Sequence, residues 1–254
     1  MGAGHAHPLY LPGSSPAHRL QPQVKVLAAF LFVCCVVATP REVFWAFGGY
    51  FLVLVGVWVV AAIPPGWIAR RALIEAPFVV LAVLLPFAEG GQRVDVAGVS
   101  LSVAGLLAGW NIVIKGTLGV LTSLTLAATT MPRDLLIGLQ RLRVPNTITT
   151  IATLMLRYFE VIIGEARRMR IARISRGHDP RLLWQAGATA RGVGSLFLRS
   201  YERGERVHLA MLSRGWNATM PMLHERPTGR REWLLGLAPV AVAVVLVSGA
   251  WWGG

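Results

Sequence analysis

The chain has 254 residues; 54% are apolar, only 15% are charged, and the formal net charge is +13. A soluble domain carries about 25% charged residues and cannot hide this much apolar surface from water, and a disordered chain is far less hydrophobic. Nucleic-acid binding would account for the positive charge but not for the apolar content. The composition therefore predicts an all-α, polytopic integral membrane protein with a basic region on one side of the lipid bilayer and no nucleic-acid partner.

Five segments are apolar and approach the length of about 17–25 residues that a membrane-spanning helix requires. In chain order they are 24–38, 43–63, 73–88, 101–130 and 233–252. A further apolar stretch, 147–163, precedes a run of charged residues, and we expect that it does not cross the bilayer completely. The chain accordingly divides into four parts: a leader (1–23), a four-span region (24–130), a basic region (131–232) and a final span (233–254).

Most of the positive charge lies in the basic region. Residues 131–232 contain 18 arginines and 8 acidic residues, a net charge of +10, whereas residues 1–130 carry +3 and residues 233–254 carry no charge. Loops rich in Lys and Arg stay on the cytoplasmic side of a membrane. We therefore expect the leader and the basic region in the cytoplasm and the carboxyl terminus outside.

The basic region has the pattern of amphipathic helices, in which apolar residues recur every three or four positions. We expect four helices, over residues 135–142, 147–177, 181–198 and 200–214. The second of them ends at Gly177 and the fourth at Gly215, because glycine commonly terminates helices. At 1.5 Å per residue the second helix is roughly 45 Å long, long enough to start among the spans and end in the cytoplasm.

The ends of the second and fourth of these helices repeat each other. The shift that carries Arg176 onto Arg214 aligns 168–177 with 206–215, and seven of the ten positions match in residue or in type. An arginine before a terminal glycine is also favoured by the negative end of the helix dipole alone. Two copies with matching upstream residues favour a binding role, because the arginine fork suits carboxylates. Two equivalent ends suit a partner with two equivalent pockets, such as a dimer.

The sequence resembles the transmembrane T component of energy-coupling-factor transporters, the EcfT family. Members carry two short motifs, usually Ala-Arg-Gly, at the ends of two cytoplasmic coupling helices. Both motifs read Ser-Arg-Gly here; their residues are Ser175, Arg176, Gly177, Ser213, Arg214 and Gly215. The segments 15–25, 129–132 and 142–145 are similar to the family's opening and central signature. The histidines of the leader (His5, His7 and His18) make it most similar to the cobalt type, CbiQ.

The resemblance implies a non-catalytic subunit of an ATP-driven importer in the bacterial cell membrane, without a cofactor. Two cytoplasmic ATPase subunits would hydrolyse ATP and receive one arginine motif each, and the movement would reorient a substrate-binding S component of the CbiM type. Arg176 and Arg214 are the expected contacts, and Ala172 and Ala210 would permit close approach. Cobalt is the expected substrate, with nickel or a vitamin as the alternative.

A basic membrane anchor that binds anionic lipid is the alternative from another class, because arginines near the inner leaflet are attracted to it. In that case the number of arginines matters and their position does not. The chain is not expected to hydrolyse ATP itself, since the string 114–117 lacks the glycine that precedes lysine in a phosphate-binding loop. The leader histidines lack a fixed geometry, so no metal site is expected.

One charged pair is expected inside the membrane. Lys115 lies within the fourth apolar segment, and a charge in a span usually faces protein rather than lipid. Glu75, near the start of the third segment, is its candidate partner in an intramembrane ion pair.

Overall fold

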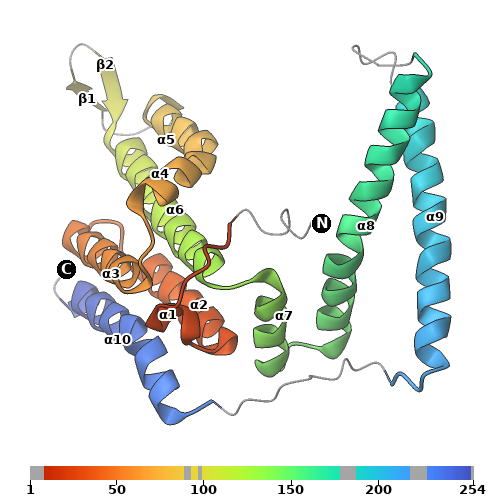
Figure 1. Cartoon of the computed structure of the whole chain (residues 1–254). Helices are drawn as coiled ribbons and strands as arrows, with labels where there is room; N and C mark the ends of the chain where they lie inside the picture. Colours follow the sequence, from red (N-terminus) through yellow and green to blue (C-terminus); the bar gives the residue numbers. More distant parts are fainter. Residues whose placement is uncertain (1–8, 89–92, 97–98, 178–186, 218–227, 253–254) are drawn as a thin grey trace. The chain divides into compact units, whose positions relative to one another are not determined.

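The computed structural model describes residues 9–88, 93–96, 99–177, 187–217 and 228–252 (Figure 1). The chain forms two compact units, one of residues 1–139 and 225–254 and the other of residues 140–224. Nearly all the described residues are helical, which confirms the all-α membrane fold. Among the described residues, four helices are long and apolar enough to cross a membrane by length and composition alone; they are α3 (Phe44–Ala61), α6 (Val103–Thr129), α8 (Asn146–Ser175) and α10 (Arg230–Trp252). Helix α8 contains the apolar stretch 147–163, and whether it crosses the bilayer stays a prediction from the sequence.

The first unit begins with a short helix, α1 (Pro16–Arg19), and a shorter apolar helix, α2 (Pro22–Ala38). Pro40 has no N–H to donate and cannot continue α2. The end of α3 is marked by Ala62, whose φ of 54° is left-handed, and by the bond from the Ile63 N–H to the Trp58 carbonyl at 3.0 Å. The two prolines that follow prevent any continuation of α3.

The third apolar segment is not one continuous span. It consists of a 3₁₀ turn (η1, Leu73–Glu75) and a helix of 13 residues (α5, Ala76–Ala88), preceded by α4 (Pro65–Ala72). Pro77 lacks the N–H that an unbroken helix would direct to the carbonyl of Leu73, so the regular helix cannot run from Leu73. The expectation of a single helix over 73–88 was therefore wrong in this detail.

A small antiparallel hairpin follows α5 and was not expected from the sequence. Its strands are β1 (Arg93–Val96) and β2 (Val99–Ser102), and Arg93 pairs with Ser102. Ser102 then starts α6, because its side chain accepts a hydrogen bond from the Gly105 N–H at 3.3 Å.

Helices α5 and α6 pack closely because two glycines of α6 face α5. A Cβ at Gly105 would lie 2.7 Å from the Pro86 Cα, and one at Gly109 would lie 2.6 Å from the Ala82 carbonyl oxygen. The neighbouring atoms are backbone and cannot move aside. Small residues four positions apart allow this close approach of helices in membranes.

The core of the first unit lies where α2, α3, α6 and α10 meet. Tyr50 is fully buried there, and its hydroxyl lies 2.8 Å from the Thr39 Oγ1. Many large apolar side chains of the same helices point away from the core; Val59 is 75% exposed and Val245 is 68% exposed. Such outward-facing apolar surface suits a lipid environment.

The second unit contains the antiparallel helices α8 and α9 (Gly187–Leu212), which lie side by side in Figure 1. The chain reaches them through α7 (Pro132–Arg141), which contains all but the last residue of the helix expected over 135–142. The two helices expected over 181–198 and 200–214 are one continuous helix in their described part. No proline interrupts α9, and the Ser200 hydroxyl donates to the Leu196 carbonyl one turn earlier at 2.8 Å. Residues 178–186 lie outside the described residues.

Candidate functional site

The two arginine motifs end their helices with the same hydrogen bonds. At the end of α8 the Arg176 N–H donates to the Arg173 carbonyl at 3.1 Å and the Gly177 N–H donates to the Ile174 carbonyl at 2.9 Å. At the end of α9 the equivalent bonds run from Arg214 to Met211 at 3.1 Å and from Gly215 to Leu212 at 2.9 Å. The repeat in the sequence is therefore a repeat in backbone structure.

Both terminal glycines adopt a left-handed conformation. The φ angle is 79° at Gly177 and 76° at Gly215. In the second copy the Trp216 N–H also donates to the Met211 carbonyl at 3.0 Å, which completes the Schellman arrangement of a helix end. Glycine meets this requirement without the steric cost that a Cβ imposes.

The side chains of both motifs are available to a partner. Arg176 and Arg214 are exposed, as are Ala172 and Ala210 one turn earlier. Among the described residues, the ion pairs involve other arginines, so neither motif arginine is paired with a carboxylate there. The serines instead donate to their own helices, Ser175 to the Ile171 carbonyl and Ser213 to the Ala210 carbonyl. The exposed arginines are thus free to bind acidic groups of another protein.

An ionic clasp, formed by Glu165, Arg199 and Arg203, joins the two helices. The Glu165 carboxylate accepts from Arg199 Nη1 at 3.0 Å and from Arg203 Nη2 at 3.4 Å. The Glu165 side chain is only 13% exposed, and the hydrogen bond from Arg199, more than any other contact, holds the pKa of its carboxyl below the ordinary value. The sequence reasoning missed this clasp, although the shift that carries Arg176 onto Arg214 also carries Glu165 onto Arg203.

The same shift relates contacts on the two sides of the clasp. On one side, a Cβ at Gly192 would lie 3.6 Å from Met169 Cε. The equivalents of these two residues are Leu154 and Val207, and both line a groove of about 300 Å³ on the other side. The pair α8–α9 therefore has an approximate two-fold arrangement centred on the clasp.

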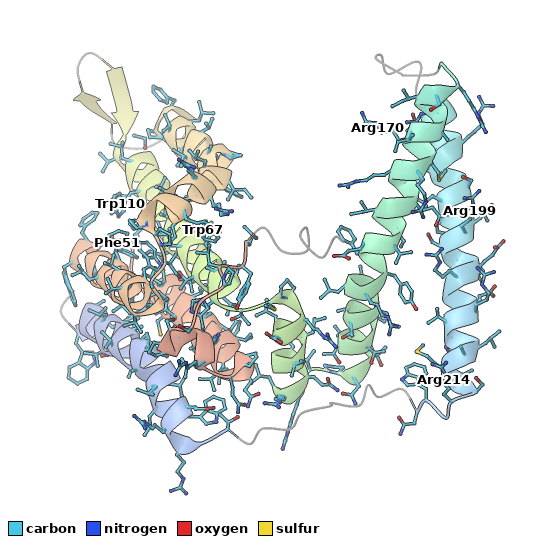
Figure 2. All side chains as sticks on the ribbon, viewed as in Figure 1. Phe51, Trp67, Trp110, Arg170, Arg199 and Arg214 are labelled. Atoms are coloured by element: carbon cyan, nitrogen blue, oxygen red, sulfur yellow. The ribbon has the colours of Figure 1, made fainter. Side chains whose placement is uncertain are left out.

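The clasp also lies midway between the two motif arginines. The stretch from Glu165 to Arg176 is as long as the stretch from Arg203 to Arg214, about three helical turns in each case. At 1.5 Å per residue each arginine lies roughly 16 Å from the clasp. Because the helices are antiparallel, the two arginines point to opposite ends of the pair, roughly 33 Å apart. Figure 2 shows Arg214 at one end of α9, whereas Arg170 lies toward the far end of α8.

The expected ion pair between Lys115 and Glu75 is not formed. Lys115 Nζ donates to the Val37 carbonyl of α2 at 2.9 Å. Glu75 is buried and accepts from Thr117 Oγ1 at 3.0 Å. Lys115 and Thr117 are close together on α6 but point to different neighbours, because successive positions of a helix differ by about 100°.

The described part of the chain contains no cluster of three or more metal-ligating side chains. Both ring nitrogens of His18 are engaged, Nδ1 with Ser15 Oγ at 2.6 Å and Nε2 with the Leu11 carbonyl at 3.0 Å. The His18 side chain therefore contacts two other residues of the leader, Ser15 and Leu11. His5 and His7 lie outside the described residues.

Comparison with known proteins identifies the family of the chain. The family model of the cobalt transport protein CbiQ matches residues 13–224, which include both arginine motifs. The chain is similar to the cobalt transport protein CbiQ of Rhodobacter capsulatus, with 31% identity over 153 residues that cover 60% of this chain and 62% of that relative. It is also similar to the energy-coupling factor transporter transmembrane proteins EcfT of Bacillus selenitireducens, 26% identical over 82% of each chain, and of Bacillus subtilis, 25% identical over 82% of this chain and 83% of the relative.

Proposed function

The chain belongs to the CbiQ family of cobalt transport proteins and is a membrane-embedded T component of the energy-coupling-factor type. We propose that it couples a pair of cytoplasmic ATPase subunits to a substrate-binding S component. In this proposal Arg176 and Arg214 each enter a groove of one ATPase subunit. The chain itself is non-catalytic, and its partners hydrolyse the ATP.

The matched ends of α8 and α9 are the observation that carries this proposal. Two exposed arginines lie at helix ends that share two matching hydrogen bonds, and the clasp lies midway between them. A dimer of ATPase subunits has two equivalent grooves related by two-fold symmetry. The helix pair α8–α9, with its approximate two-fold symmetry, would present one arginine to each groove. Because the clasp connects the two helices, movement of the ATPase subunits would then move both helices together.

The proposed orientation places the basic region, 131–232, in the cytoplasm beside the ATPases. The leader, 1–23, lies on the same side, the apolar helices of 24–130 and 233–254 lie in the bilayer, and the carboxyl terminus is outside. The excess of arginine in the basic region supports this orientation because such loops are retained in the cytoplasm. Arginines that contact no partner would then face the anionic inner leaflet.

The test is co-purification of the ATPase pair with the chain carrying Arg176→Ala and Arg214→Ala. Each arginine should contribute about 2 kcal/mol, roughly thirtyfold in affinity, as an interface anchor does, so the double variant should lose the ATPases. Arg167→Ala with Arg170→Ala removes the same charge from exposed positions of α8 and is the matched control. Equal loss in the two double variants would support the membrane-anchor alternative and contradict the coupling proposal.

We propose cobalt ion as the substrate that the complete transporter takes up. The similarity to proteins named for cobalt transport supports this choice, whereas the EcfT relatives leave nickel or a vitamin as the second candidate. Uptake of radioactive cobalt by cells producing the chain with its ATPases and a CbiM-like S component tests the proposal. Uptake of nickel but not of cobalt by the same cells would contradict it.

A further inference from the structure

The first unit contains an apolar cavity of about 560 Å³ among α1, α2, α3, α6 and α10. Small residues on three helices, Ala29, Gly56 and Gly236, form part of its wall. The cavity opens to the surface, since Val60 and Leu235 line it and are 54% and 57% exposed. Its walls come from the first half of α2, the second half of α3, the last turns of α6 and the first half of α10. All of these lie toward one end of the unit.

Positively charged side chains lie at and near the cavity. Lys25 lines the cavity and donates to the His18 carbonyl at 3.2 Å and to the Thr129 carbonyl at 2.9 Å. An ammonium has three N–H groups, so these two bonds leave a donor that can face the cavity. Three exposed cations lie close by in the chain, one next to the lining residue Leu20 and two in the first turn of α10; they are Arg19, Arg230 and Arg231.

Hydrogen bonds connect the residues just before α10 to the start of α2, close to these cations. Gln21, just before α2, accepts from Thr228 Oγ1 at 2.7 Å, and Gln23 donates to the same hydroxyl. Among the described residues, the acidic groups near these cations are Asp134, whose charge acts on Lys25, and Glu232 in the first turn of α10. In this described part, four cations against two carboxylates leave a net positive charge.

We propose that this cavity binds one acyl chain of an anionic phospholipid, whose phosphate lies at the cations around Lys25. A volume of about 560 Å³ lies in the usual range of ligand sites, roughly 300–1,000 Å³, and the apolar wall fits a hydrocarbon chain. A partner helix, about 10–12 Å wide, would fill the same volume with only about one turn. The charge at the mouth selects an anionic head group over a zwitterionic one. Placement in the inner leaflet rests on the proposed orientation, whereas binding itself does not.

Two glycines of α3 provide a matched pair of variants for the test. A Cβ at Gly56 or at Gly48 would have no atom within 4 Å, so either position accepts a larger side chain without a backbone clash. Gly56 lines the cavity, whereas Gly48 does not. Gly56→Leu therefore adds a bulky side chain at the cavity wall, and Gly48→Leu adds the same side chain elsewhere on the same helix.

The experiment counts the lipids that the full-length protein retains in native mass spectrometry. The protein in mild detergent receives equal amounts of phosphatidylglycerol and phosphatidylcholine. The wild type and Gly48→Leu should retain one phosphatidylglycerol, and Gly56→Leu should retain it about tenfold less. Arg230→Gln with Arg231→Gln changes only exposed side chains and should weaken the preference for phosphatidylglycerol about fivefold per arginine.

Two results would overturn the proposal. One is retention by Gly56→Leu equal to that of Gly48→Leu, which would place the retained lipid outside the cavity. The other is equal retention of the two lipids by the wild type, which would remove the role of the cations. Neither result depends on the ATPases, so the lipid site and the coupling proposal fail or succeed separately.

Discussion

At the scale of single residues, the conformation of Gly215 terminates α9 and sets the direction of the chain beyond it. Its φ of 76° is left-handed, and a Cβ built there would have no atom within 4 Å beyond those of its chain neighbours. A substitution there is disfavoured by backbone strain alone and not by a clash. Gly194, in the interior of the same helix, is also surrounded by open space but has helical geometry. The two glycines therefore isolate the effect of conformation from the effect of packing.

The same change, glycine to alanine, should have opposite effects at these two positions. Gly215→Ala should destabilise the end of α9 by about 1 kcal/mol, because a Cβ in the left-handed region is strained. Gly194→Ala should stabilise α9 by about 0.5–1 kcal/mol, because alanine favours the helix. Amide hydrogen exchange at Trp216, whose N–H bonds to Met211, measures the first effect. Unchanged exchange at Trp216 in Gly215→Ala would show that the left-handed glycine does not hold the helix end.

At the scale of elements, the Glu165 clasp fixes how α8 crosses α9 and hence where the two motif arginines lie. Ion pairs near a surface contribute only about 0.2–1 kcal/mol each to stability. Loss of the clasp should therefore leave both helices folded while it loosens their crossing. Spin labels at Ala172→Cys and Ala210→Cys, both exposed, report the distance between the helix ends in a chain with Cys34 and Cys35 replaced by alanine.

Glu165→Arg should broaden the distribution of distances between the two labels. The reversed clasp, Glu165→Arg with Arg199→Glu and Arg203→Glu, restores opposite charges and should narrow the distribution again. Restoration separates an ionic role from a general effect of substitution, as in a double-mutant cycle. A narrow distribution in the single variant would mean that the apolar contacts in the groove hold the helices without the clasp.

The local features of these elements could be predicted from the sequence, and the contacts between them could not. The helical period and the terminal glycine predicted α8 and an end within two residues of Ser175, because both depend on neighbouring residues. The position of Glu165 opposite Arg203 depends on the partner helix. Lys115 illustrates the same limit: burial of a charge in a span predicted a protein partner, but the partner is the Val37 carbonyl.

At the scale of the whole molecule, the distribution of charge supports the proposed orientation in the membrane. The basic region carries +10 of the total of +13. With the leader in the cytoplasm, the proposed orientation would place Glu42, between α2 and α3, outside, and would place both Arg70 of α4 and the arginines of α8 inside. The reverse orientation would place the basic region outside the cell, against the retention of arginine-rich loops.

Labelling of single cysteines in intact cells tests this orientation. In a chain with Cys34→Ala and Cys35→Ala, a membrane-impermeant thiol reagent should label Glu42→Cys but neither Arg70→Cys nor Arg167→Cys, and all three positions are exposed in the structure. Permeabilised cells provide the control, since all three cysteines should then react. Labelling of Arg167→Cys in intact cells would place the motif arginines outside the cytoplasm. An ATPase in the cytoplasm could then not reach them, so this result would exclude the coupling function as well as the orientation.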